Sequence, residues 1–335
     1  MTEKSYGGAA PFRKQGKNTK DIFNSNFSEK EKKAKKEFED ESELEKKKIL
    51  KAGEISSKVR EYVKQIVKKD VLLLEIADKI EDKIIELGGK PAFPVNLSIN
   101  DIAAHYTPFV DDKTKAHGLL KVDFGAHVDG WISDTSISFD LDGTEENKIL
   151  IQAAEEALGS ALKVAKDGVI LANIGKEIQN VIESYKAVPV INLTGHSISY
   201  YDLHSGFSIP NYNNKGKEVM EEGVYAIEPF ATFGNGKIYD GKPSGIYSLE
   251  DEKNVRSPIA RKILDFIIEE YATLPFSSKW IVRKFGQSAL FGLKQLEENG
   301  NIHQYNQLVE VSHRNVAQAE HTILVEKDKV IITTK

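Results

Sequence analysis

The stretch Val122–Asp134, VDFGAHVDGWISD, places two aspartates inside a run of apolar and strand-forming residues. Asp129-Gly130 is a strong two-residue hairpin signal, so the flanking strands should fold back and bring Asp123 and Asp134 opposite one another, give or take a bulge. A buried, ionised carboxylate is costly unless it pairs, hydrogen-bonds or binds a metal. Because two facing carboxylates repel, the pair favours a shared cation over two solvated acids on a hairpin rim.

Farther along the chain, two glutamates also lie inside apolar, strand-like runs. Glu228 interrupts the strand-like run Val224–Ala231, and Glu320 interrupts the run Val316–Val325. Between them and the aspartates, His196 follows a glycine that we expect to end a strand. Any one of these residues alone is more often a solvated acid or a core histidine. Together, four carboxylates and one imidazole on separate strands are a ligand set for divalent ions, and bridging carboxylates permit two ions about 3.5–4 Å apart.

The five residues and their surroundings resemble those of the methionine aminopeptidases, most closely the archaeal members of type 2. The family's ordered ligands Asp, Asp, His, Glu and Glu fall on the five residues above, and the likeness runs from about Lys51 to the C-terminus. The motifs that carry it are AAHYTP at 103–108, GHSI at 195–198, LHSG at 203–206, AIEPFAT at 226–232 and EHTILVEKD at 320–328.

The resemblance implies an α/β pita-bread fold, in which two related halves place the metal site at their junction. Residues 51–335 are expected to form this catalytic domain. Residues 250–315 are expected to form a helical, winged-helix-like insert within it, because three amphipathic segments follow the helix-start signal Ser257-Pro258. Residues 1–50 form a charged extension that we expect to be disordered or loosely helical.

The resemblance also implies the roles of the ligands around two divalent ions. Asp134 and Glu320 would bridge both ions, Asp123 would bind one, and His196 with Glu228 would bind the other. Bound ions would lower the pKa of a shared water from about 15.7 toward ~7, so that hydroxide can attack at neutral pH. Glu228 would also pass a proton to the leaving amine. The ligand types accept Co, Mn, Fe or Zn.

Four further residues are expected around the substrate. By the same resemblance, His105 and His204 would hold the scissile carbonyl or the leaving nitrogen. Phe93 and Leu203 would form walls of a narrow apolar pocket for methionine. One residue departs from the family pattern: Ala319 stands where an aromatic residue usually precedes the last ligand, and we expect it to enlarge or loosen that wall.

The favoured function is removal of the initiator methionine from nascent proteins with a small second residue, so nascent polypeptide N-termini are the expected partners. One alternative is a prolidase-like dipeptidase with the same ligands, but such enzymes usually carry an extra N-terminal domain that the charged extension cannot form. The other is a non-enzymatic relative that binds ribosomes or RNA, which the five intact ligands argue against. Residues 1–50 hold 13 basic and 10 acidic residues; they could touch the ribosome, but a solvated tail is favoured.

Composition bounds the remaining possibilities. The chain has 335 residues, 40% of them hydrophobic, which is enough for a large core. It contains no cysteine, which excludes disulfides and cysteine nucleophiles. No apolar run approaches the ~20 residues of a membrane helix, and the start lacks the apolar core of a signal peptide, so we expect a cytoplasmic protein without a membrane partner. The insert lacks a dense basic face, so we expect no specific DNA binding. A monomer is expected.

Periodicity and capping signals predict the elements as follows. Helices are expected over 55–67, 71–89, 148–166, 174–185, 259–271, 277–285 and 288–298. Strands are expected near 99–105, 118–124, 131–139, 190–193, 224–231, 317–325 and 329–333.

Overall fold

The first helix spans two parts of the chain. The computed structural model describes residues 29–335, and expectations for residues 1–28 lie outside that range. The chain divides into two units, Met1–Lys48 and Ile49–Lys335, and α1 (Glu29–Ile66) begins in the first and ends in the second. The part of α1 that belongs to the second unit has a buried apolar face. This face includes Ile55, Val59 and Val63, which are spaced as in an amphipathic helix. The predicted boundary at residue 50 therefore falls inside a continuous helix.

The predicted hairpin is confirmed, but its register differs from the expectation. Strands β4 (Leu119–Val128) and β5 (Trp131–Asp140) are joined by Asp129 and Gly130, whose φ angles of 47° and 86° suit a type I′ turn. The ladder runs without a bulge, so Asp123 lies opposite Ser136 and Asp134 lies opposite Gly125. The two aspartates are therefore diagonal neighbours on one face, because the two-residue turn fixes an offset of two positions.

The two faces of this hairpin have different environments. Side chains such as Val122 and Phe124 pack with α1 and α2 (Leu73–Glu86) in one apolar cluster. Since successive strand residues point to opposite faces, Asp123 lies on the other face, away from these helices. The sheet is completed by two strands that pair with β4, β1 (Lys90–Pro91) and β2 (Asn96–Ile99).

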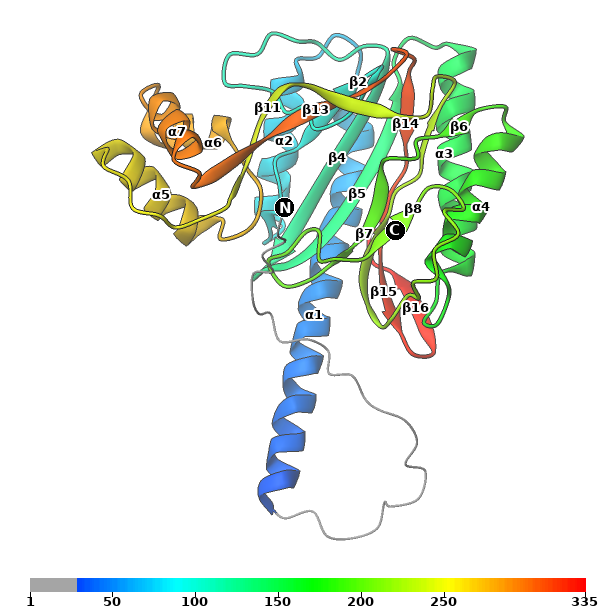
Figure 1. Cartoon of the computed structure of the whole chain (residues 1–335), viewed down its shortest axis with the longest axis horizontal. Coiled ribbons are helices and arrows are strands. Elements are labelled where there is room, and N and C mark those ends of the chain that lie inside the picture. The colour runs from blue at the N-terminus through cyan, green and yellow to red at the C-terminus, as the bar shows by residue number, and fades with distance from the viewer. Residues whose placement is uncertain (1–28) are drawn as a thin grey trace. The chain divides into compact units, whose positions relative to one another are not determined.

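A second group of strands lies beside the hairpin under two helices. Figure 1 shows α3 (Glu145–Val164) and α4 (Leu171–Ser184) side by side on these strands, where their buried residues form the largest apolar cluster. One sheet has the order β16-β15-β9-β7-β8 and another the order β14-β10-β6. Their bounds are β6 Val188–Pro189, β7 Thr194–Ile198, β8 Ser208–Pro210, β9 Gly223–Ile227, β10 Phe230–Thr232, β14 Val316–Gln318, β15 His321–Glu326 and β16 Lys329–Ile332.

Three strand predictions in this group are corrected by the structure. Residues 190–193 form a turn, and His196 lies inside β7, with Gly195 in the strand rather than at its end. The predicted strand 224–231 is two strands, β9 and β10, separated by Glu228 and Pro229. The predicted strand 317–325 is likewise β14 and β15, separated by Ala319 and Glu320. Each run therefore changes sheets at the residue that interrupts its apolar pattern.

The three helices predicted in the insert are present, but two long strands around them were missed. Helices α5 (Pro258–Glu270), α6 (Ser278–Phe285) and α7 (Ala289–Glu298) follow β11 (Ile238–Leu249) and precede β13 (Ile302–Glu310). These two strands pair with each other, with β12 (Phe276–Ser277) and with β3 (Ile102–Ala104). In Figure 1 the helices lie on the side of the strands opposite α3 and α4. The winged-helix character of the insert stays a prediction.

All strand pairs among residues 29–335 are antiparallel, rather than the mixture that the sequence suggested. Within the same residues, every helix is too short or too polar to traverse a lipid bilayer.

Candidate metal centre

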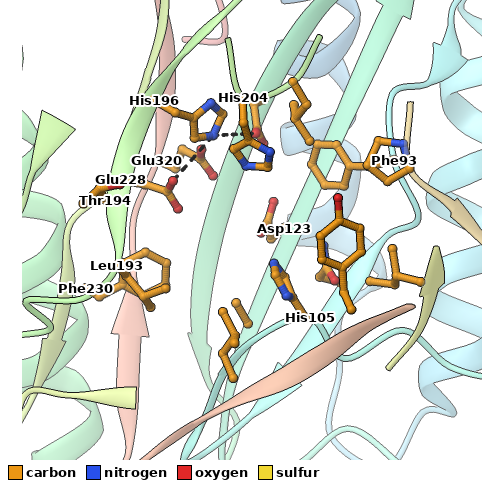
Figure 2. A pocket seen from close by; sticks show the side chains of 18 of the residues that line it. Phe93, His105, Asp123, Leu193, Thr194, His196, His204, Glu228, Phe230 and Glu320 are labelled. Carbon is orange, nitrogen blue, oxygen red and sulfur yellow. Dashed lines mark ion pairs between the residues drawn. The ribbon is translucent and has the colours of Figure 1, made fainter. Parts of the chain in front are cut away.

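One cavity of about 250 Å³ contains all nine residues that the sequence singled out. Figure 2 shows Asp123, Glu228, Glu320 and His196 around a common space, with His105 and His204 entering from opposite sides of Asp123. The nine lining residues are Phe93, His105, Asp123, Asp134, His196, Leu203, His204, Glu228 and Glu320.

The five candidate ligands come from three strands and from two gaps between strands, and they converge. Asp123 and Asp134 lie on the hairpin, and His196 lies on β7. The imidazole Nε2 of His196 is 3.6 Å from Oδ2 of Asp134 and 3.6 Å from Oε1 of Glu228. Ligand atoms of Asp134, His196 and Glu320 all lie within 4.8 Å of one another, and these three residues are buried.

The two glutamates project because the strands around them break at the same place. Strand β9 pairs with β15 and β10 pairs with β14, so the gap at Glu228-Pro229 lies beside the gap at Ala319-Glu320. Proline has no N–H to donate to a ladder, which explains the break on one side. The Ala319 amide donates to the Pro229 carbonyl at 3.3 Å and joins the two gaps. Both carboxylates thereby leave the sheets and reach the cavity.

Burial and mutual repulsion work against ionisation of this cluster. Burial raises the pKa of Asp123 to about 7, while a hydrogen bond from Gln318 opposes the rise. Burial, and then the charges of neighbouring carboxylates, raise the pKa values of Asp134 and Glu320 well above their usual range. Burial also holds the pKa of His196 well below its usual value, so the ring is neutral and can bind a metal.

The orphaned atoms at the site fit divalent cations. Oδ1 of Asp123 and Oδ1 of Asp134 are buried and have no hydrogen-bond partner. Buried polar atoms are rarely left unpaired, and a cation between carboxylates would satisfy these oxygens and relieve their repulsion. Oxygen ligands with one imidazole suit Mn, Fe, Co or Zn. The side chains present therefore fit the predicted metal.

The two histidines beyond the ligand set reach the cavity in different ways. His105 has a φ angle of 65°, a conformation uncommon outside glycine, directly after β3. Its Nδ1 lies 3.2 Å from the Asn306 carbonyl, which fixes that nitrogen as the donor and leaves Nε2 as an acceptor. Burial lowers its pKa to about 4, so the ring is neutral. The His204 ring, on an exposed part of its loop, lies 4.3 Å from the ring of His196.

The apolar wall has more members than the sequence predicted. Phe93 and Leu203 line the cavity as expected, and a Cβ on Gly125 would come within 2.5 Å of the Phe93 ring. Glycine at this position therefore lets Phe93 pack beside the ligand strand. The expectation for Ala319 is wrong: it packs in the apolar core beneath α3 and α4 and does not line the cavity. The missed apolar lining residues are Pro94, Ala104, Leu193, Phe230, Ile246, Pro275, Tyr305 and Leu308.

Two polar residues behind the ligands were also missed. Gln318 donates to Glu228 at 3.3 Å and to Glu320 at 3.5 Å, and its position two residues before the last ligand was an available signal. Arg60, on α1, donates to the Glu320 carbonyl at 3.2 Å. Arg60 lies 260 residues from Glu320 in the sequence. No motif near Arg60 indicates a contact with the metal centre.

Comparison with known proteins agrees with this geometry. The family model for metallopeptidase family M24 matches residues 47–327. The chain is similar to the methionine aminopeptidase of Pyrococcus horikoshii, with 45% identity over 86% of this chain and 99% of that protein. Its fold is similar to solved structures of a Thermotoga maritima methionine aminopeptidase (TM-score 0.63, 21% identity, covering 86% of this chain and 96% of that one) and a Pyrococcus furiosus prolidase (TM-score 0.56, 17% identity, covering 87% and 64%).

Proposed function

The chain belongs to metallopeptidase family M24 and has its pita-bread α/β fold, and we propose that it is a methionyl aminopeptidase that removes the initiator methionine from newly made proteins with a small second residue. The observation that carries the proposal is the convergence of four carboxylates and His196 at one end of a cavity whose other walls are apolar. The identity to a methionine aminopeptidase over nearly its whole length supports the same activity.

We propose two divalent ions in this centre, held by the five ligands in the arrangement that the family likeness implies. Asp134 and Glu320 would hold both ions, Asp123 would bind one of them, and His196 with Glu228 would bind the other. When bound, the ions polarise a carbonyl and make hydroxide available at neutral pH. Which of Co, Mn, Fe or Zn occupies the centre depends on availability as well as on affinity.

The chain's own residues supply proton transfer and charge stabilisation. Glu228 has a raised pKa, caused first by burial and then by Asp123, which suits a carboxyl group that takes a proton and returns it to the leaving amine. The Nε2 of His105 has no proton when Nδ1 donates to Asn306, so it can accept from the N–H of the scissile amide. His204, near His196, is placed to donate to a carbonyl oxygen as negative charge develops there.

The cavity volume supports recognition of one side chain. A space of about 250 Å³ lies just below the roughly 300–1,000 Å³ of pockets that hold drug-sized ligands. Phe93, Leu203 and Tyr305 give it apolar and aromatic walls, which suit a flexible thioether. Peptide N-termini are therefore the proposed partners. A monomeric state and a cytoplasmic location are parts of the same proposal.

The test is cleavage of two peptides by metal-stripped protein after Mn or Co is returned. Release of methionine from Met-Ala-Ser, lost in an Asp134→Ala control, is the expected result. Turnover of Ala-Pro alone would favour the prolidase-like alternative. Folded protein that binds metal but cleaves neither peptide would favour the non-enzymatic alternative.

A further inference from the structure

A guanidinium lies directly behind the candidate metal centre. Arg60 is a mostly buried residue of α1, and its Nη1 donates to the hydroxyl of Thr135 and to the Ser136 carbonyl at 2.9 Å, as well as to Glu320. Among the described residues 29–335, Arg60 forms no salt bridge, so all three acceptors are formally neutral. A charge that is removed from water normally has an opposite charge beside it.

The acceptors of Arg60 lie where the regular ladder is missing. Glu320 occupies the gap between β14 and β15, and its carbonyl receives one further donor, the Thr135 hydroxyl at 2.8 Å. Its amide donates to the Ser136 carbonyl at 3.2 Å, the same carbonyl that Arg60 holds. Arg60 therefore joins the backbone of one proposed bridging ligand to the strand that carries the other, Asp134.

Strand alternation places α1 behind the ligands rather than among them. Ser133 and Thr135 of β5 face the helix, while Asp134 between them faces the cavity. One turn before Arg60, the Ser56 hydroxyl lies 2.8 Å from the Ser133 hydroxyl. The helix thus holds the back of the ligand strand through Ser56, through the Ala52 carbonyl, which accepts from the Ser133 hydroxyl at 2.9 Å, and through Arg60. Of these, only Arg60 is charged and reaches Glu320.

The charge on Arg60 has a direct electrostatic consequence. With two divalent ions bound, the four carboxylates would be balanced, and a hydroxide would leave one net negative charge, which Arg60 would offset. The guanidinium group of arginine is protonated at any physiological pH. Arg60 therefore stays protonated at neutral pH.

We propose that Arg60 is a positioning residue of the metal centre, which fixes Glu320 relative to Asp134 through their backbone and offsets one negative charge, so that divalent ions bind tightly. The inference rests on the proposed metal-dependent function. It assigns to α1 a part in metal binding, in addition to its part in the core.

Calorimetric titration of metal-stripped protein with Mn²⁺ tests this inference without measuring activity. Arg60→Met removes the charge and the donors, and we expect affinity to fall about 10- to 100-fold, the usual effect of losing a residue that orients metal ligands. Arg60→Lys keeps the positive charge but loses the planar guanidinium group with its several donors. Its Mn²⁺ affinity should therefore lie between those of Arg60→Met and the unaltered protein. Ser56→Ala is the matched control, and its affinity should stay within about twofold.

The outcomes separate the inference from the function on which it rests. Folded Arg60→Met protein with unchanged Mn²⁺ affinity would overturn the inference, and so would an equal loss in Ser56→Ala, since helix docking alone would then explain it. If Arg60→Met does not fold, Arg60→Lys decides: an affinity equal to that of Ser56→Ala overturns the inference. Failure of the unaltered protein to bind Mn²⁺ would instead contradict the proposed metal centre.

Discussion

At the scale of single residues, the site depends on carboxylates that are unfavourable without metal. Burial raises the pKa of Asp123 from 3.8 to about 7, so the folded, metal-free protein holds a proton there that the unfolded chain has released. The contribution of Asp123 to the free energy of unfolding is complete below about pH 4. It is lost as the pH rises from about 4 through about 7. Bound metal reverses the preference, because the ions favour the ionised carboxylate.

We therefore predict that metal-free protein is more stable at pH 5 than at pH 8, by roughly 1–3 kcal/mol through this group. Urea denaturation in the presence of a chelator measures the difference. The Asp123→Asn variant cannot ionise at this position and should show a smaller difference. Greater stability of the metal-free protein at pH 8, unchanged by Asp123→Asn, would contradict the assignment of Asp123 as a buried, unpaired acid.

At the scale of elements, the hairpin turn fixes the ligand strand. Gly130 has a φ angle of 86°, and a Cβ added there would lie 2.2 Å from the ring of Tyr201, whose amide donates to the Gly130 carbonyl at 2.9 Å. The segment that follows Tyr201 carries Leu203 and His204 into the cavity. One small residue therefore permits both the turn and the close approach of the loop.

We predict that Gly130→Ala destabilises the protein by roughly 1–3 kcal/mol, because the left-handed backbone and the contact with Tyr201 both oppose a side chain. It should also raise the KM for Met-Ala-Ser by displacing the loop. Thermal unfolding and steady-state kinetics measure the two effects, with Gly143→Ala as the control, since that glycine also has a positive φ but has no heavy atom within 4 Å of an added Cβ. An equal change in KM in both variants would contradict the role of the loop.

Some elements of the fold could be predicted from the sequence, and others could not. The hairpin, the insert helices and all five candidate ligands follow from local signals: a two-residue turn, helix starts, and charges inside apolar runs. The offset of Asp123 from Asp134 could have been derived by counting from the turn. The split at Glu228 had a signal in Pro229. The split at Glu320 had none, because one apolar run serves equally well for one strand or for two strands in different sheets. Strand β11 was missed because most of its first half is exposed and contains a glycine and a proline.

Across the whole molecule, a partly buried ionic cluster joins the insert to the catalytic region. Lys279 on α6 has no exposed surface and lies 2.9 Å from both Asp78 and Glu81 of α2. The Arg283 guanidinium donates two hydrogen bonds to the Asp78 carboxylate, at 2.7 and 2.8 Å. The Trp280 indole N–H donates to Glu81 at 2.9 Å. Since β11 and β13 both line the cavity and flank the insert, this cluster helps to hold one cavity wall.

We predict that Lys279→Met destabilises the protein by roughly 3–5 kcal/mol, because Glu81 and Asp78 lose a buried partner. Adding Glu81→Gln should recover part of the loss, since it removes the uncompensated charge. Urea denaturation of the single and double variants measures this. A single variant as stable as the unaltered protein, or a double variant no better than the single, would show that the cluster does not dock the insert.

The central claim is that five converging ligands form a metal centre that releases methionine from peptides. Its most direct test is one titration of metal-stripped protein with Mn²⁺, in which bound metal per chain and methionine released from Met-Ala-Ser are followed together. We expect binding of two ions per chain and methionine release that depends on the added metal, with both reduced in Asp134→Ala. Methionine release that persists without metal, or that is unchanged in Asp134→Ala, would contradict it.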